Sequence, residues 1–234
     1  MNELLAGIGD AFSLLIALDP DLLEISSLSL QVSLTAVLIA AVIGLPFGAW
    51  LSVSRFRYRR SAIAILNALM GLPPVVVGLI VYLLFSRSSP FGVFNLLFTP
   101  TAMIIAQTIL VTPIIASLTH QTLRELWFQY HDLLISMNAS KWQRMKTLLW
   151  EGRRGLLTAS LTGFGRAIGE IGAIMIVGGN IDHLTRVLTT AIALEVGKGN
   201  FPLALGLGFI LIAIAIFINM AVHILSKTER EGTW

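Results

Sequence analysis

The stretch RELWFQYHDLLISMNASKWQRMKTLLWEGRR, residues 124–154, is polar and basic and lies between two long hydrophobic segments. Within it, apolar residues recur at helical spacing over 132–137 and again over 142–149, which predicts two short amphipathic helices. Asn138 can adopt the left-handed conformation that ends a helix. Ser140 and Gln143 have the S-x-x-Q spacing of a capping box, which begins the next helix. The stretch is therefore predicted to form a helix, a sharp corner and a second helix.

The segment that begins at Asp132 resembles the EAA loop of bacterial ABC importer permeases, whose usual form is E-A-A-x-x-x-G followed by a short aliphatic close. Asp132 stands where glutamate is usual, Leu133 and Leu134 replace two alanines, and Asn138 replaces the glycine. In that family the loop transmits closure of a cytoplasmic ATPase. The resemblance implies that the coupling residues here are Asp132, Leu133, Leu134, Met137, Asn138, Ala139, Ser140 and Trp142. Without the resemblance, the loop also fits a solvated amphipathic connection between two membrane spans.

The composition is that of an integral membrane protein. Hydrophobic residues make up 56% of the 234 residues and charged residues 12%, whereas about 25% is usual in soluble domains. The chain has no cysteine, and its four histidines have no metal-site spacing, so we expect no metal and no cofactor. No phosphate-binding loop of the G-x-x-x-x-G-K-[ST] type is present, so ATP hydrolysis is expected on a separate subunit rather than on this chain. A single domain over residues 1–234 is expected.

Hydrophobic segments predict an all-α polytopic fold with five membrane-spanning helices, since a span needs about twenty apolar residues. They lie at about 28–53, 61–86, 100–122, 156–179 and 201–226. Residues 1–18 have an apolar helical face but are too short and too charged to span. They are predicted to form an interfacial helix that lies on the membrane.

The basic residues predict the orientation in the membrane. If residues 55–60, the loop 124–154 and the C-terminal tail are cytoplasmic, that side carries four, six and two lysines or arginines. Residues 1–54 carry none and hold five acidic residues. The positive-inside rule therefore places the N-terminus outside and the C-terminus in the cytoplasm, which agrees with an odd number of spans.

Prolines interrupt three of the predicted spans. Proline in a helix interior removes a backbone hydrogen bond and kinks the helix. Kinks are therefore expected at Pro46, at Pro73 and Pro74, and at Pro113. Such kinks would suit a gated pathway, although glycine and proline are also generally more frequent in membrane helices than in soluble ones.

The fourth predicted span contains the only formally charged residues inside any span, Arg166 and Glu170. Each costs about 2.5–3.5 kcal/mol near the bilayer centre, so both must face protein or water. Gly165 and Gly169 are spaced to let another helix backbone approach closely. Two interpretations stay open: Arg166 supplies positive potential to an anion pathway, or the two residues form a self-neutralising pair that fixes helix packing or a subunit interface.

Three further segments narrow the resemblance. Residues 71–79, 165–173 and 177–181 look like the molybdate, tungstate and sulfate branch of ABC permeases, in which A-R-A-x-G-E-F/I-G-A followed by G-N is typical. Gly165 replaces the usual alanine. Residues 185–195 are most similar to the tungstate permease group.

The resemblance implies a permease subunit of an ATP-driven oxyanion importer, with tungstate the favoured cargo and molybdate or sulfate the alternatives. It implies two copies of this chain, two ATP-binding subunits and an external binding protein, with no nucleic-acid partner. The location would be the cell membrane of a bacterium or archaeon. Apart from the resemblance, the helices also fit an ATP-independent channel or secondary transporter, although no internal repeat supports the latter. A membrane-embedded enzyme is disfavoured, because the sequence offers no cysteine, no metal-site spacing and a single Arg/Glu pair.

Overall fold

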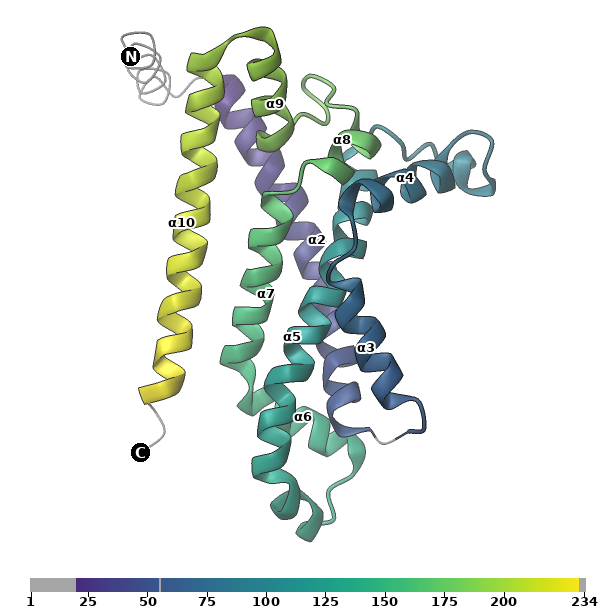
Figure 1. Cartoon of the computed structure of the whole chain (residues 1–234), viewed down its shortest axis with the longest axis vertical. Helices are drawn as coiled ribbons and strands as arrows, with labels where there is room; N and C mark the ends of the chain where they lie inside the picture. The colour runs from purple at the N-terminus through teal and green to yellow at the C-terminus, as the bar shows by residue number, and fades with distance from the viewer. Residues whose placement is uncertain (1–19, 55, 232–234) are drawn as a thin grey trace. The chain divides into compact units, whose positions relative to one another are not determined.

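The computed structural model describes residues 20–54 and 56–231, and every regular element in that part of the chain is a helix (Figure 1). This confirms the all-α class. The helix predicted over residues 1–18 lies outside the described residues.

Within the described residues, three helices are long and apolar enough to cross a membrane: α2 (Pro20–Val53), α5 (Pro100–Ser136) and the Phe201–Met220 part of α10 (Phe201–Glu231). The count rises to five if two interrupted pairs are each taken as one span. These pairs are α3 (Arg59–Leu69) with α4 (Pro74–Phe85), and α7 (Arg153–Ile168) with α8 (Gly172–Gly178). The remaining described helices are short: η1 (Pro90–Phe94), α6 (Lys141–Glu151) and α9 (Leu188–Lys198).

The second and fourth predicted spans are therefore broken helices, where single helices were expected. In the second, Pro73 is extended, with φ −65° and ψ 120°, and Pro74 is the first residue of α4. A proline fits the first helical turn because the N–H that it lacks would have no partner there, so the pair starts a helix where a kink was predicted. Pro46 and Pro113 lie inside α2 and α5, which are assigned as continuous helices through both positions.

The described residues form two compact units. Unit one comprises residues 20–36, 73–107 and 167–218. Unit two comprises residues 37–72, apart from 55, together with 108–166 and 219–231. The long helices α2, α5 and α10 contribute residues to both units.

In unit one, α4 packs closely on α8. A Cβ atom added to Gly78 would lie 2.8 Å from the Ala173 Cα, so only glycine allows this approach of backbone to backbone. A separate apolar cluster joins the start of α2 to α9 and α10 through Leu22, Leu188, Ala191 and Leu207.

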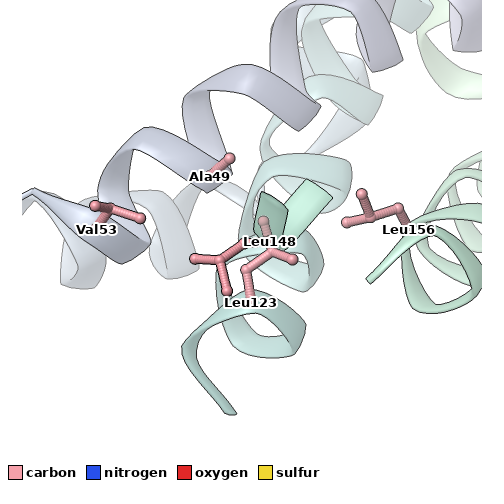
Figure 2. Close-up of a cluster of buried hydrophobic side chains, with 5 residues drawn as sticks. All are labelled: Ala49, Val53, Leu123, Leu148 and Leu156. Atoms are coloured by element: carbon pink, nitrogen blue, oxygen red, sulfur yellow. The ribbon is translucent and has the colours of Figure 1, made fainter. Parts of the chain in front are cut away.

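In unit two, a buried cluster ties the end of α2 to α5, α6 and α7. Its members are Ala49, Val53, Leu123, Leu148 and Leu156, and Figure 2 shows Leu123 and Leu148 pointing toward one another. Gly48 brings α2 against α5, because a Cβ atom there would lie 2.5 Å from the Ala116 carbonyl oxygen. Burial of these side chains fixes α6 against the helices that flank it.

Candidate functional site

The corner between α5 and α6 has the local geometry that the sequence predicts. Asn138 is left-handed, with φ 51°, and the Ala139 N–H donates to the Leu134 carbonyl at 3.1 Å. The Ser140 N–H donates to Gln143 Oε1 at 2.7 Å, and the Gln143 N–H donates to Ser140 Oγ at 3.3 Å. The capping box and the left-handed corner are thus confirmed. The separate short helix predicted over 132–137 is wrong, because residues 132–136 are the end of α5, which finishes at Ser136.

A clasp that the sequence analysis missed holds the corner from α6. Arg144 Nε donates to the Ala139 carbonyl at 2.7 Å, and its guanidinium lies 5.9 Å from the centre of the Trp127 ring. Trp127 packs edge-on against His131, with ring centres 4.9 Å apart.

The corner presents apolar side chains to its surroundings. Leu133, Met137 and Trp142 are 54%, 69% and 69% exposed, and Asp132 is fully exposed beside His131, with 2.9 Å between Oδ1 and Nδ1. Leu134 differs from the other predicted coupling residues, because it is buried. Asn138, Ser140 and the partly buried Ala139 form the corner itself. Exposed apolar groups gathered at one place mark an interaction surface.

Two hollows adjoin this surface, both within unit two, and Lys141 and Val53 line each of them. One, of about 260 Å³, is completed by Trp127, His131, Ile135 and Arg144. The other, of about 270 Å³, is completed by Trp50, Ser54, Trp142 and Met145. The corner is therefore a shaped surface rather than a smooth one.

Glu170 is buried and caps a helix. Its Oε1 accepts hydrogen bonds from the Gly172 N–H at 2.9 Å and the Ala173 N–H at 3.3 Å, the first N–H groups of α8. The Thr189 hydroxyl donates to the Glu170 carbonyl at 2.9 Å, which ties α9 to the same place. A carboxylate at a helix N-terminus also interacts favourably with the helix dipole.

Arg166 lies in the last turn of α7, and both it and Gly165 are exposed. Because α7 ends at Ile168 and α8 begins at Gly172, Arg166 and Glu170 are not successive turns of one helix, as the expectation of a continuous fourth span had assumed. Gly169, also exposed, lies in the break. Arginine near a helix C-terminus is favoured by the helix dipole.

A polar pocket in unit one was not anticipated from the sequence. It has a volume of about 270 Å³ and lies between the start of α2 and the segment 182–207. On its wall the His183 imidazole and the Glu24 carboxylate are 2.9 Å apart. Glu195 is buried and accepts hydrogen bonds from Lys198 Nζ and Asn200 Nδ2, both at 2.8 Å. The hydrogen bond from Lys198 lowers the pKa of the Glu195 carboxyl, although burial opposes the shift.

Glu24 also controls the titration of His183. The hydrogen bond to its carboxylate, and then its charge, raises the pKa of the His183 imidazole above the ordinary value of 6.5. The stability that this pair contributes is therefore fully present below pH 6.5 and is lost as the pH rises through the raised pKa. In Glu24→Gln we expect the imidazole to titrate closer to 6.5, as measured by the chemical shift of labelled histidine. An unchanged midpoint would contradict the pairing.

Comparison with known proteins identifies the family. Residues 44–230 match the family described as binding-protein-dependent transport system inner membrane component. The chain belongs to this family. It is accordingly a multi-pass inner-membrane component of a transport system.

Relatives that are transport permeases match most of the chain. It is 39% identical to the tungstate uptake system permease protein of Peptoclostridium acidaminophilum, over 97% of this chain and all of the relative. It is also 39% identical to a probable anion ABC transporter permease protein of Haloferax volcanii, over 85% of this chain and 88% of that one. The sulfate transport permease of Escherichia coli is 27% identical, over 84% of this chain and 75% of the relative.

Solved structures agree on the fold. An inward-facing crystal form of the MetNI methionine ABC transporter matches with a TM-score of 0.69 at 20% identity, over 92% of this chain and 97% of that chain. A second crystal form of that transporter matches with a TM-score of 0.67 at 21% identity, over 88% and 94% of the two chains. This permease therefore has the fold of an ABC transporter membrane subunit.

Proposed function

We propose that this chain is the membrane-spanning permease of an ABC importer for tungstate. The observation that carries the proposal is the 39% identity, over 97% of this chain and all of the relative, to a tungstate uptake permease. A second tungstate permease, from Campylobacter jejuni, is 38% identical over 74% of this chain. Molybdenum and sulfate permeases are more distant, at 29% identity or less. Molybdate and sulfate are the second candidates.

The corner between α5 and α6 is the proposed contact with the ATP-binding subunit. Three features of the corner support this: exposed Leu133, Met137 and Trp142, the fixed turn at Asn138, and the clasp from Arg144. A flexible turn would lose conformational entropy when it became ordered on binding. A turn whose backbone groups are already hydrogen-bonded avoids this cost and can transmit a movement of the ATP-binding subunit directly. Leu134 is buried, so its proposed role is to support the corner from within the fold. Asp132 is exposed, and its negative charge would favour positively charged groups on the ATP-binding subunit.

Two copies of the chain and an external binding protein complete the proposed importer. Exposed Arg166, with Gly165 beside it and Gly169 three residues later, would line the route or the interface between copies, and its positive charge would favour a dianion. Glu170 has a different proposed role, because its carboxylate already holds the first N–H groups of α8. It would keep α8 in place rather than meet the cargo.

Cysteine cross-linking tests the proposed partner contact, because the natural chain contains no cysteine and a single introduced thiol is unique. Trp142→Cys, treated with a reagent that joins thiols to amines in the assembled transporter, is expected to yield a cross-link to the ATP-binding subunit. Phe94→Cys, an aromatic of similar exposure at 61%, serves as the control and should yield none. Absence of the Trp142→Cys product, or equal product from both variants, would contradict the contact.

A further inference from the structure

A small cavity in unit two lies where α2 ends, next to the two hollows that adjoin the corner. It has a volume of about 170 Å³ and is formed by the end of α2, the start of α3 and one face of α5. The lining residues are Ser52, Val53, Ser54, Arg59, Arg124, Trp127 and Phe128. None of them is acidic and two are arginines, so the cavity has a positive potential.

Arg59 is a fixed charge on one wall of the cavity. Its Nε donates to the Leu51 carbonyl at 2.9 Å and its terminal nitrogen to the Ser52 carbonyl at 3.4 Å. These carbonyls belong to the last turn of α2, whose negative dipole end the guanidinium offsets. The charge is therefore held in place before any ligand arrives.

Arg124 and Ser54 supply donors on the other walls. The Arg124 guanidinium lies 5.7 Å from the centre of the Phe128 ring, and within residues 20–54 and 56–231 it makes no hydrogen bond or ion pair. Over the same residues the Ser54 hydroxyl makes no hydrogen bond. A guanidinium and a hydroxyl that share a cavity match the acceptor oxygens of a phosphate-type anion.

An aromatic surface adjoins the cavity. Phe47, Trp50 and Phe56 form a stack, with successive ring centres 5.9 Å and 5.2 Å apart, and Tyr58 is exposed nearby in the sequence. Val53 and Ser54 line the cavity and also the hollow that contains Trp50, so the two features share a wall. Aromatic belts beside basic residues are typical of the level at which lipid headgroups lie.

We propose that this cavity binds the phosphate of an anionic phospholipid. Arg124 and Ser54 donate to the phosphate oxygens, Arg59 supplies a fixed positive charge, and the acyl chains lie along Phe47 and Trp50. Basic pockets beside membrane helices are suited to such headgroups. The site is independent of the identity of the transported ion.

Retention of lipid by the full chain, purified with its accompanying subunits in mild detergent, tests this assignment. With phosphatidylglycerol added, native mass spectrometry is expected to show about tenfold weaker retention in Arg124→Gln than in the wild type, the effect of losing one charge-assisted hydrogen bond. Phosphatidylcholine should be retained weakly by both. The matched control is Arg153→Gln, because Arg153 also lies over an aromatic ring, Trp150, at 5.0 Å but does not line this cavity.

Two further measurements separate the outcomes. Ser54→Ala should weaken phosphatidylglycerol retention less than Arg124→Gln, because it removes a neutral donor. Inorganic phosphate at millimolar concentration should not displace the lipid, and displacement would overturn the lipid as the ligand. Equal retention of phosphatidylglycerol by the wild type, Arg124→Gln and Arg153→Gln would overturn the site itself.

Discussion

Cells whose permease carries Trp142→Asp are expected to take up no tungsten above background, although the protein reaches the membrane in normal amounts. Trp142 is 69% exposed in the first turn of α6, so an aspartate there should not disturb the fold. A large exposed aromatic is typical of an interface hot spot, and its loss costs about 2 kcal/mol or more of binding. When the ATP-binding subunit covers this position, the aspartate is buried without a partner, which adds a desolvation penalty to binding.

Two companion variants make this result specific. Trp142→Phe keeps an aromatic anchor and should retain most of the uptake. Trp150→Asp makes the same charge change near the other end of α6, at 67% exposure, and should also retain uptake. Tungsten uptake and the amount of co-purifying ATP-binding subunit are measured for each variant. Equal loss of both in Trp142→Asp and Trp150→Asp would contradict a contact centred on the corner.

Glu170→Ala is expected to reduce the yield of folded permease to a small fraction of the wild-type yield. The substitution leaves the Gly172 and Ala173 N–H groups without the Glu170 acceptor in a buried place, at a cost of about 1–3 kcal/mol for each. The sum is a large part of the roughly 5–15 kcal/mol that stabilises a typical protein. Size-exclusion chromatography of a fluorescent fusion measures the loss as a smaller monodisperse peak, together with a lower thermal midpoint.

Glu170→Gln is the control that separates capping from charge. Its amide oxygen can accept the same N–H groups, so it should fold nearly as well as the wild type, with a small loss from the missing charge at the start of α8. If Glu170→Ala folds as well as Glu170→Gln, the cap is not what holds α8. If both fold poorly, the charge is required and the capping account is incomplete.

The local chemistry of the corner could be predicted from the sequence because it depends on neighbours in the chain. Ser140 and Gln143 cap each other, and Asn138 tolerates a positive φ, whatever the rest of the protein does. The exact end of α5 could not be predicted from hydropathy. The helix continues from Arg124 to Ser136, beyond the end of the apolar run.

The broken spans show the limit of the apolar pattern. A window of hydropathy averages over the few residues of a break, so 61–86 and 156–179 read as single spans. Pro74 was an available signal, since proline favours the first turn of a helix. The break at 169–171 has no proline. Glu170 caps α8 from two residues away, whereas the hydrogen bond that it receives from Thr189 forms only in the folded chain.

Two other features, the contacts of Arg144 and the pairing of His183 with Glu24, could not be predicted from the sequence because they are tertiary contacts. Arg144 folds back onto Ala139 and Trp127, and His183 meets Glu24 from a position 159 residues away in the sequence. Neither pairing follows from residue spacing. Arg166 and Glu170, for which two interpretations were open, have different surroundings, because Glu170 caps α8 while Arg166 is exposed at the end of α7.

The most direct test of tungstate import is elemental mass spectrometry of cells supplied with nanomolar tungstate and molybdate together. Three strains are compared: intact cells, cells in which this chain is deleted, and the deletion complemented with the wild-type chain. We predict that deletion abolishes tungsten accumulation, leaves molybdenum accumulation largely intact, and is reversed by complementation. Unchanged tungsten accumulation in the deletion, or selective loss of molybdenum, would contradict tungstate as the cargo.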